Sequence, residues 1–324
     1  MKALALLSGG LDSILAVKLI LDQGIDVEAI NFVTPFDLSD NDRTVEIAKR
    51  LNIPLKTMNI GKEYFKILRK PKHGFGKNMN PCIDCRIFML KDAKKYAKKI
   101  GALFIFTGEV LDERPMSQNR KALDIIDKEA GLEGKVLRPL SARLLSETEI
   151  ERKGWVDREE LLAIRGKQRR PQMELAKKFR ITDYPSPSGG CLLTYKEFSD
   201  KVKDLFQHKK KVSMKDVKLL KIGRHFRFGK NKIIIGRNET ENKQLSNLKQ
   251  PDDYAFEVSE FNGPIAILQG SKTKEAVEKT ARLTVRYSDA KGEALVKFGR
   301  KKLNKTIIVS PIDEKEIEKL RIKY

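Results

Sequence analysis

Three cysteines, Cys82, Cys85 and Cys191, carry the most distinctive chemistry in this sequence of 324 residues. The first two form a C-x-x-C pair in NPCIDCR, where a helix is expected to begin, and the third stands far along the chain in SPSGGCLLT. A thiol at the amino end of a helix is expected to have a lowered pKa, and the neighbouring Arg86 favours the thiolate further. Thiolates can carry sulfur or bind metal, so the three are candidate catalytic residues. A small buried hydrophobe is the alternative for each.

Three thiolates are one ligand short of a closed tetrahedral zinc site. They suit a [4Fe-4S] cluster in which one iron stays open for an extra sulfide, and we favour this interpretation. The alternative is redox sulfur transfer, in which one cysteine carries a persulfide and another resolves it as a disulfide. Spacing alone does not separate the two.

A glycine-rich loop, SGGLDS, begins at Ser8 between an expected strand and an expected helix. The backbone amides of Gly9 and Gly10 can approach phosphate oxygens with the positive end of the helix behind them, and Ser8 and Ser13 add hydroxyl donors. Asp12 can hold Mg²⁺ or orient the loop. The chain contains neither G-x-x-x-x-G-K-[ST] nor G-x-G-x-x-G. This is therefore a phosphate-binding loop without the usual lysine.

The elements that must position these residues alternate along the first part of the chain. Short apolar runs predict strands, and amphipathic stretches with apolar residues at three- and four-residue steps predict helices. This alternation predicts an α/β fold, a parallel sheet with helices on both faces, whose ligands bind at the carboxyl ends of the strands. Residues 110 to 195 are less regular. The expected strands are 3–7, 27–33, 55–60 and 102–106, and the expected helices are 12–24, 42–52 and 85–101.

The charge of the chain favours a polyanionic partner. Its 66 Lys and Arg against 44 Asp and Glu give a net charge of +22, which suits nucleic acid, although a lysine-rich solvated surface is the alternative. No apolar window is long enough for a membrane span, and MKALALLSGG is too short for a secretory leader. We therefore expect a cytoplasmic protein without a membrane partner. Three cysteines at uneven spacing do not predict a disulfide framework.

Composition changes near residue 205, where strongly basic text leads into β-rich text. We therefore expect two domains, 1–205 and 206–324, the second a smaller α+β domain. Its basic residues cluster around Phe226 and Phe228, a combination that suits phosphate contact and base stacking. A basic solvated hairpin is the alternative. The candidate RNA-binding residues are Lys218, Lys221, Arg224, Arg227, Lys230, Lys232 and Arg237.

SGGLDS after the first strand resembles the signature of the PP-loop ATP pyrophosphatases, which have an adenine nucleotide alpha-hydrolase-like fold. The resemblance implies that the loop holds the pyrophosphate of ATP while a substrate oxygen attacks the α-phosphorus and becomes adenylated. A site that releases pyrophosphate can rely on backbone amides, hydroxyls and metal, whereas γ-phosphoryl transfer requires a lysine at the β- and γ-phosphates.

Residues 85–142, from CRIFMLKDAKKYAKKIG through FIFTGEV and ERPMSQNR to LRPLSA, resemble the catalytic half of tRNA 4-thiouridine synthetases and, more loosely, tRNA 2-thiouridylases. The resemblance covers roughly residues 1–195. It implies that Gly108, Glu109, Ser117 and Gln118 line the pocket for ATP and the substrate base, with Cys82, Cys85 and Cys191 on the sulfur-delivery side. It also implies ATP, Mg²⁺, tRNA and a sulfide source, with sulfide accepted by a [4Fe-4S] cluster.

Residues 214–310 resemble the RNA-binding domain of the NFACT family, in the order HFRFGKNKIIIG, DDYAFEV, NGPIAILQG and EAVEKTARLTVRYSDAKGEALVKFG. Together the resemblances imply a tRNA sulfurtransferase that makes 4-thiouridine at position 8. Alternatives are 2-thiouridine at the anticodon wobble position, a PP-loop ligase or amidotransferase on a small molecule, and an RNA-binding protein that senses ATP. No general base is assigned; His73 is expected in a loop near the site, as a loop or RNA contact. The oligomeric state stays open, a homodimer included.

Overall fold

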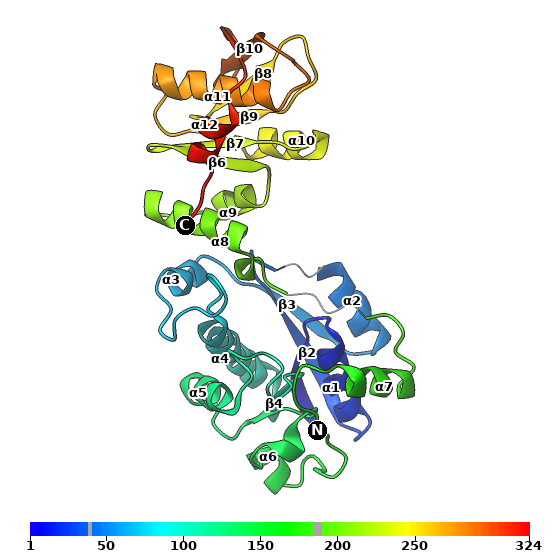
Figure 1. The fold of residues 1–324 in the computed structure, drawn as a ribbon. Coiled ribbons are helices and arrows are strands. Elements are labelled where there is room, and N and C mark those ends of the chain that lie inside the picture. Colours follow the sequence, from blue (N-terminus) through cyan, green and yellow to red (C-terminus); the bar gives the residue numbers. More distant parts are fainter. Residues whose placement is uncertain (38–40, 185–189) are drawn as a thin grey trace. The chain divides into compact units, whose positions relative to one another are not determined.

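The computed structural model describes residues 1–37, 41–184 and 190–324, which divide into two compact units, Met1–Thr194 and Tyr195–Tyr324 (Figure 1). The boundary expected at residue 205 falls inside helix α8 (Lys196–His208), which belongs to the second unit and packs on α9 (Met214–Leu220). The basic composition that suggested the boundary starts within this helix and not at its beginning.

The first unit is built on a parallel sheet. Within the described residues its order is β3-β2-β1-β4-β5, and every pair of neighbouring strands is parallel. This confirms the α/β fold predicted from the alternation of strands and helices. The strands are β1 (Lys2–Leu6), β2 (Asp26–Val33), β3 (Leu55–Asn59), β4 (Phe104–Thr107) and β5 (Val136–Leu137).

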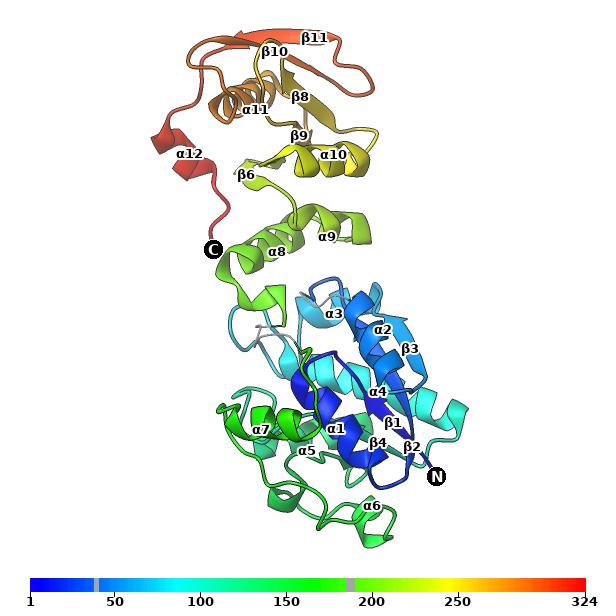
Figure 2. The same cartoon turned by 90° about the vertical axis from the view of Figure 1, so that its right-hand side faces the viewer.

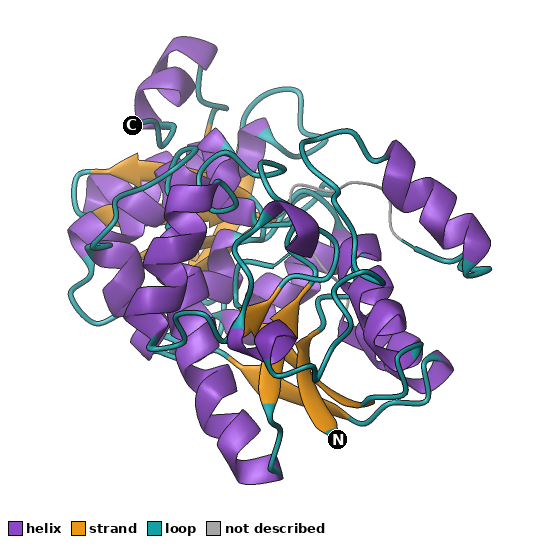
Figure 3. Cartoon of the chain, turned by 90° about the horizontal axis from the view of Figure 1, so that it is seen from below, coloured by secondary structure: helices purple, strands orange, loops and turns teal. Residues whose placement is uncertain are grey.

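Helices cover both faces of this sheet (Figures 1 and 3). The three helices expected from sequence correspond to α1, α2 and α4, and further helices lie in the regions that read as irregular. The helices are α1 (Leu11–Leu21), α2 (Asn41–Arg50), α3 (Glu63–Arg69), α4 (Cys82–Ile100), α5 (Arg120–Ala130), α6 (Glu149–Arg152) and α7 (Arg170–Lys178), with 3₁₀ turns at Ala142–Leu144 and Leu192–Thr194.

The alternation of side chains along β1 shows why two helical layers form. Ala3, Ala5 and Leu7 belong to the core that contains α1 and α7, whereas Leu4 and Leu6 belong to the core that contains α4 and α5. Successive side chains of a strand point to opposite faces, so a central strand that is apolar throughout must be covered on both. β1 is such a strand, and its carboxyl end leads directly into the glycine loop.

The second unit is an antiparallel α+β domain, as expected (Figure 2). In the described part of the chain its sheet has the order β11-β10-β8-β9-β7-β6. A large core packs α11 and α12 against the sheet, and a smaller core places residues of α9 and α10 against β7 and β9. The remaining elements are β6 (Arg224–Phe228), β7 (Asn231–Ile235), α10 (Glu239–Leu248), β8 (Tyr254–Val258), β9 (Ala266–Gln269), α11 (Lys274–Arg286), β10 (Ala294–Gly299), β11 (Lys305–Val309) and α12 (Glu314–Leu320).

Among the residues that the structure describes, none of the helices combines the length and the apolar character that crossing a membrane requires.

Candidate active site

The strand order of the first sheet reverses between β1 and β4. In parallel α/β sheets, ligands bind at the carboxyl ends of the strands beside such a reversal. The loops that follow β1 and β4 contact each other there: a Cβ on Gly108 would lie 2.5 Å from the backbone nitrogen and Cα of Ser13. Only glycine permits this approach, so Gly108 contributes by its lack of a side chain.

The glycine loop has the local geometry of an anion site. Gly9 has φ +75°, and Gly10 is the extended N-cap of α1. Ser13 Oγ donates to Gly10 O at 2.8 Å and accepts from the Ser8 N–H at 3.3 Å, which ties the loop across its opening. The first helical bond is from Ile14 N to Gly10 O. The preceding amides of the first turn have no carbonyl within the helix to bind, so they can serve an anion.

Asp12 lies in the first turn of α1, largely buried. Burial raises the pKa of its carboxyl, while the positive charges of Arg169 and Arg114 oppose that rise. Its Oδ1 is buried without a hydrogen-bond partner among the described residues. An orphaned carboxylate oxygen beside a phosphate loop fits a hard divalent cation such as Mg²⁺.

Helix α7 contributes polar groups that the sequence analysis did not identify. Gln172 is fully buried, and within the described ranges both polar atoms of its side chain lack a hydrogen-bond partner. Gln172 and Arg169 both influence the Asp12 carboxyl, and α7 packs on α1. Unsatisfied buried polar groups are rare in folded proteins, so they mark space for a polar ligand. No short motif in RGKQRRPQ signals this role.

Glu109, expected to line the pocket, is instead the centre of a buried charge network. It accepts from Arg138 Nε at 3.1 Å and Thr107 Oγ1 at 3.1 Å, and Arg86 Nε lies 3.4 Å away. Arg138 also forms a fork with Asp127, with both N···O distances 2.8 Å. Although burial opposes it, the charges of the two arginines lower the pKa of Glu109. Glu109 thus holds Arg86 in place near the start of α4.

Ser117 and Gln118 are buried in the loop after β4. The Ser117 side chain hydrogen-bonds to the Cys82 thiol. The Oε1 of Gln118 is buried and has no hydrogen-bond partner within residues 1–37, 41–184 and 190–324. One residue of this loop therefore reaches the cysteine region, and the next offers an unused acceptor.

The three cysteines converge in the first unit and are free thiols. Cys82 and Cys85 open α4, and Cys191 forms an isolated β-bridge with Asp37. Cys85 hydrogen-bonds to the buried hydroxyl of Tyr64. Negative charge on Cys82 and on Cys85 would raise the pKa of Cys191. The prediction that two distant sequence segments bring their thiols together therefore agrees with this geometry.

The expected lowering of the thiol pKa values is wrong for the metal-free protein. Burial raises the pKa of Cys82, and it raises that of Cys85 to about 11 and that of Cys191 to about 12. The positive charge of Arg86 does favour the thiolates of Cys82 and Cys85, as expected, but desolvation outweighs it. A buried thiol of this kind becomes a thiolate when a metal takes the place of its proton.

A single metal ion does not fit the cysteine region. No group of three or more His, Cys, Asp or Glu side chains among the described residues is arranged to hold one. A cubane cluster distributes its thiolates over different irons, so its ligands lie further apart than those of a mononuclear site. Three converging, buried, unpaired thiols meet the donor chemistry of such a cluster.

Arg114 connects the phosphate loop to the cysteines. Its charge lowers the pKa of both Asp12 and Cys82. Its two terminal nitrogens lie 3.8 Å from the position that a Cβ on Gly190 would occupy, next to Cys191. An exposed guanidinium between an anion loop and a set of thiols can neutralise negative charge that moves from one to the other. The sequence analysis missed this residue, since ERPMSQ contains no recognised charge pattern.

His73 lies in a loop that is fixed to its neighbours. Its Nε2 is 2.9 Å from Glu129 Oε1, and the backbone amides of Lys72 and His73 donate to the carboxylate of Asp84 at 2.8 and 3.0 Å. Asp84 stands between the two cysteines of the C-x-x-C pair. The loop contact that was one expectation for His73 is therefore present, and it stabilises the start of α4.

The candidate RNA-binding residues of the second unit divide into two groups. Arg227 and Lys232 hold the buried Asp204, with Arg227 Nε at 2.8 Å and Lys232 Nζ at 3.5 Å. This internal ion pair removes them from the surface that phosphate can reach, a correction to the sequence-based assignment, because their acid lies on the distant helix α8. Arg224 covers the ring of Tyr287 at 4.5 Å. Lys218, Lys221, Lys230 and Arg237 are exposed, the last paired with Glu241.

Comparison with known proteins identifies two segments. Residues 1–152 match the family model described as thiamine biosynthesis protein (ThiI), and residues 223–321 match the NFACT protein RNA binding domain. The chain thus joins a ThiI-type PP-loop segment to an NFACT RNA-binding domain, which confirms both resemblances.

Several curated relatives carry the name probable tRNA sulfurtransferase. One from Ureaplasma urealyticum is 36% identical over 116 residues, covering 35% of this chain and 30% of its own. One from Thermococcus kodakarensis is 29% identical over 148 residues, covering 43% and 36%. The chain spans about a third of the length of these relatives.

Two solved structures are similar at low identity. A 4-thiouridine synthetase–RNA complex with bound ATP has 22% identity and a TM-score of 0.36, covering 68% of this chain and 52% of the other. The U34-tRNA thiolase NcsA from Methanococcus maripaludis, with its [4Fe-4S] cluster, has 19% identity and a TM-score of 0.37, covering 64% and 67%.

Proposed function

We propose that this chain is an ATP-dependent tRNA sulfurtransferase, which adenylates a uridine carbonyl oxygen and replaces it with sulfur. The ThiI-type segment, the names of the relatives and the NFACT RNA-binding domain support this class. The observation that carries the proposal is Arg114, whose charge reaches both the acid of the glycine loop and a thiol of the cysteine set. Activation and sulfur delivery would then share one site.

In the first step the carbonyl oxygen attacks the α-phosphorus of ATP, and the bond to the β-phosphate breaks. The amides of Gly9, Gly10 and the first turn of α1 receive the pyrophosphate, with the hydroxyls of Ser8 and Ser13 beside them. Asp12 would hold Mg²⁺ through its unpartnered oxygen. When bound, Mg²⁺ supplies charge neutralisation on the departing group.

In the second step sulfide adds to the activated carbon and the carbon–oxygen bond to AMP breaks. Sulfide is already at the oxidation level of the product, so the exchange needs no oxidant or reductant. Cys82, Cys85 and Cys191 would hold a [4Fe-4S] cluster, whose chemistry is to bind and present sulfide. The residues around the thiols fix the site: Tyr64 hydrogen-bonds to Cys85, and Glu109 orients Arg86.

The order of motifs along the first unit favours 4-thiouridine at position 8 of tRNA. Formation of 2-thiouridine at the anticodon wobble position is the second candidate, because three converging thiols suit either product. A small-molecule ligase or amidotransferase would use the same glycine loop but would not need the second unit.

The test is nucleoside mass spectrometry after anaerobic incubation of the protein, reconstituted with iron and sulfide, with Mg-ATP, sulfide and an unmodified tRNA transcript. We expect 4-thiouridine, lost with a U8C transcript and lost in Cys191→Ser. A product of 2-thiouridine assigns the second candidate. Absence of any thionucleoside with cluster-loaded protein, together with pyrophosphate release that ammonia stimulates and tRNA does not, overturns the proposal.

A further inference from the structure

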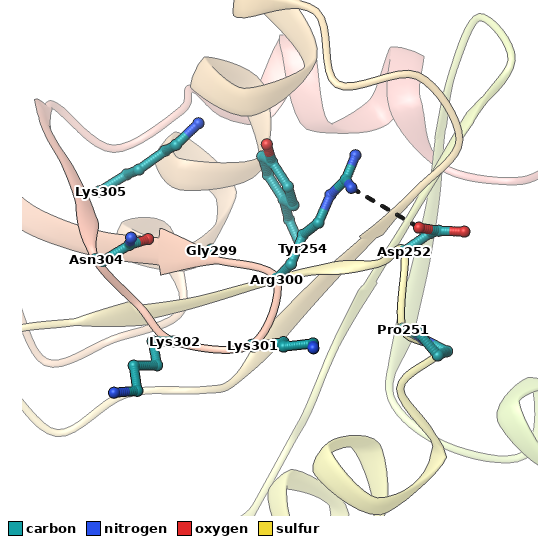
Figure 4. Close-up of a pocket in the computed structure, with 9 residues that line it drawn as sticks. All are labelled: Pro251, Asp252, Tyr254, Gly299, Arg300, Lys301, Lys302, Asn304 and Lys305. Atoms are coloured by element: carbon teal, nitrogen blue, oxygen red, sulfur yellow. Dashed lines mark ion pairs between the residues drawn. The ribbon is translucent and has the colours of Figure 1, made fainter.

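A pocket in the second unit lies around Tyr254, the first residue of β8. It is lined by residues other than the basic ones of segment 218–237, and nothing so far assigns it a role. Figure 4 shows the tyrosine ring with Arg300 and Lys305 beside it, and the chain between them forming the turn that joins β10 to β11. We name it the Tyr254 pocket and define it by Tyr254, Lys272, Arg300, Lys301, Lys302 and Lys305.

Three cations surround one aromatic ring in this pocket. Lys305 Nζ, Lys272 Nζ and Arg300 Cζ lie 5.6, 5.7 and 5.9 Å from the centroid of the Tyr254 ring. Cations within about 6 Å of a ring face are attracted by its negative quadrupole. One ring cannot offset three positive charges, so the pocket keeps an excess of positive charge.

Acidic groups balance this charge only in part. Arg300 pairs with Asp252 at 3.9 Å, and that carboxylate is 90% exposed. Such a pair contributes little at an exposed site, since water screens it. Lys272 is partly buried, and both burial and the charge of Arg300 lower the pKa of its amine. An anion bound between these groups would relieve their mutual repulsion.

The backbone presents the cations in a fixed arrangement. Gly299 ends β10 opposite Ala255 of β8, and a Cβ on Gly299 would lie 2.0 Å from the carbonyl oxygen of Lys302. The turn is therefore too tight for any residue but glycine, and it sets Arg300 to Lys302 next to the ring. Phe298 lies behind the tyrosine, with ring centroids 5.9 Å apart. A ring supported in this way can act as a stacking surface.

We propose that the Tyr254 pocket binds a nucleotide of single-stranded RNA, with phosphates on Arg300, Lys301 and Lys305 and a base against the Tyr254 ring. An aromatic ring among unbalanced cations is the combination that proteins use to hold single-stranded nucleic acid without sequence preference. The inference rests on the RNA-binding part of the proposed function. It places a contact of the tRNA on the β8–β10–β11 edge of the second unit.

The test measures binding of the full-length chain to a 12-nucleotide single-stranded RNA and to a tRNA transcript at several salt concentrations. In Arg300→Gln/Lys301→Gln/Lys305→Gln we expect the slope of log affinity against log salt to fall by about 3, because each lost phosphate contact lowers it by about 1. Lys291→Gln/Lys315→Gln/Lys319→Gln removes the same charge from exposed positions outside the pocket and should change the slope by less than 1.

Stacking is tested separately with Tyr254→Leu, which keeps an apolar contact to Phe298. Its affinity for the 12-mer should fall by about fivefold to a hundredfold, the usual effect of removing one base–aromatic stack. Circular dichroism and thermal unfolding confirm that the variant is folded. Equal slopes for the two triple variants, or a polyglutamate peptide that displaces RNA only from the wild type, overturn the inference.

The readout keeps the two proposals apart. If no thionucleoside forms but the pocket variants lose RNA affinity, the proposed reaction fails and the pocket stands. If thiolation proceeds and the pocket variants bind RNA as the wild type does, the pocket fails and the reaction stands.

Discussion

Replacing Gly9 by alanine should disturb the phosphate loop in two ways that the structure lets us separate. Gly9 has φ +75°, a left-handed conformation that costs an alanine about 1–2 kcal/mol. The added Cβ would also lie 2.7 Å from Thr44 Oγ1 in a buried position. Overpacking of this kind costs about 1–3 kcal/mol. We therefore expect Gly9→Ala to lower the free energy of unfolding by about 2–5 kcal/mol.

Gly24 supplies the matched control. It has φ +73°, nearly the same backbone conformation, but a Cβ there would meet no described heavy atom within 4 Å. Gly24→Ala should therefore lose only the backbone contribution of about 1–2 kcal/mol. The difference between the two variants measures the contact with Thr44.

Urea unfolding gives the stabilities, and titration calorimetry gives the affinity for Mg-ATP below the unfolding transition. We expect Gly9→Ala to lose about tenfold or more in ATP affinity, since the loop amides must shift to admit the methyl group. Gly24→Ala should bind ATP as the wild type does. The reasoning is refuted if the two variants lose the same stability, or if Gly9→Ala binds ATP with wild-type affinity.

Three further predictions concern charges. Arg114→Ala should slow alkylation of Cys82 in the metal-free protein by up to about fivefold, because the guanidinium favours the thiolate, and Arg114→Lys should restore most of the rate, as mass spectrometry can follow. Arg138→Met leaves the buried Glu109 and Asp127 unpaired and should lower the free energy of unfolding by about 3–5 kcal/mol; thermal unfolding at wild-type temperature would contradict the network. Burial holds the pKa of His225 well below 6.5, so the unfolded state binds its proton more readily, and stability should fall as pH drops below 6.5, by up to about 1.4 kcal/mol per pH unit. Urea unfolding between pH 5 and 7 should show a flatter pH dependence in His225→Leu.

Much of the first unit could be predicted because its signals are local. The strand, the glycine loop and the helix from Lys2 to Leu21 follow one another directly, and apolar runs and amphipathic stretches identify their neighbours in the sheet. β5 could not be recognised in the same way, since Val136 and Leu137 are its only residues. A strand that short depends on β4 beside it and leaves no periodic pattern.

Contacts between distant segments explain what the sequence could not predict at the site. Burial, which raises the thiol pKa values, is a property of the packed unit, whereas the helix end that should lower them is visible in the C-x-x-C pair itself. Arg227 resembles a phosphate contact until Asp204 is found beside it. The roles of Arg114 and Gln172 likewise depend on Asp12, which lies about a hundred or more residues earlier in the chain.

The contact between Gly108 and Ser13 also sets an order of events during synthesis. The glycine loop leaves the ribosome early, but β4, which completes its surroundings, is made only after four helices have followed. A nascent chain that ends before β4 has no partner for this side of β1, so it cannot form the nucleotide site. ATP can therefore stabilise this unit only once its sheet has closed around β1, and it offers no help to earlier folding intermediates.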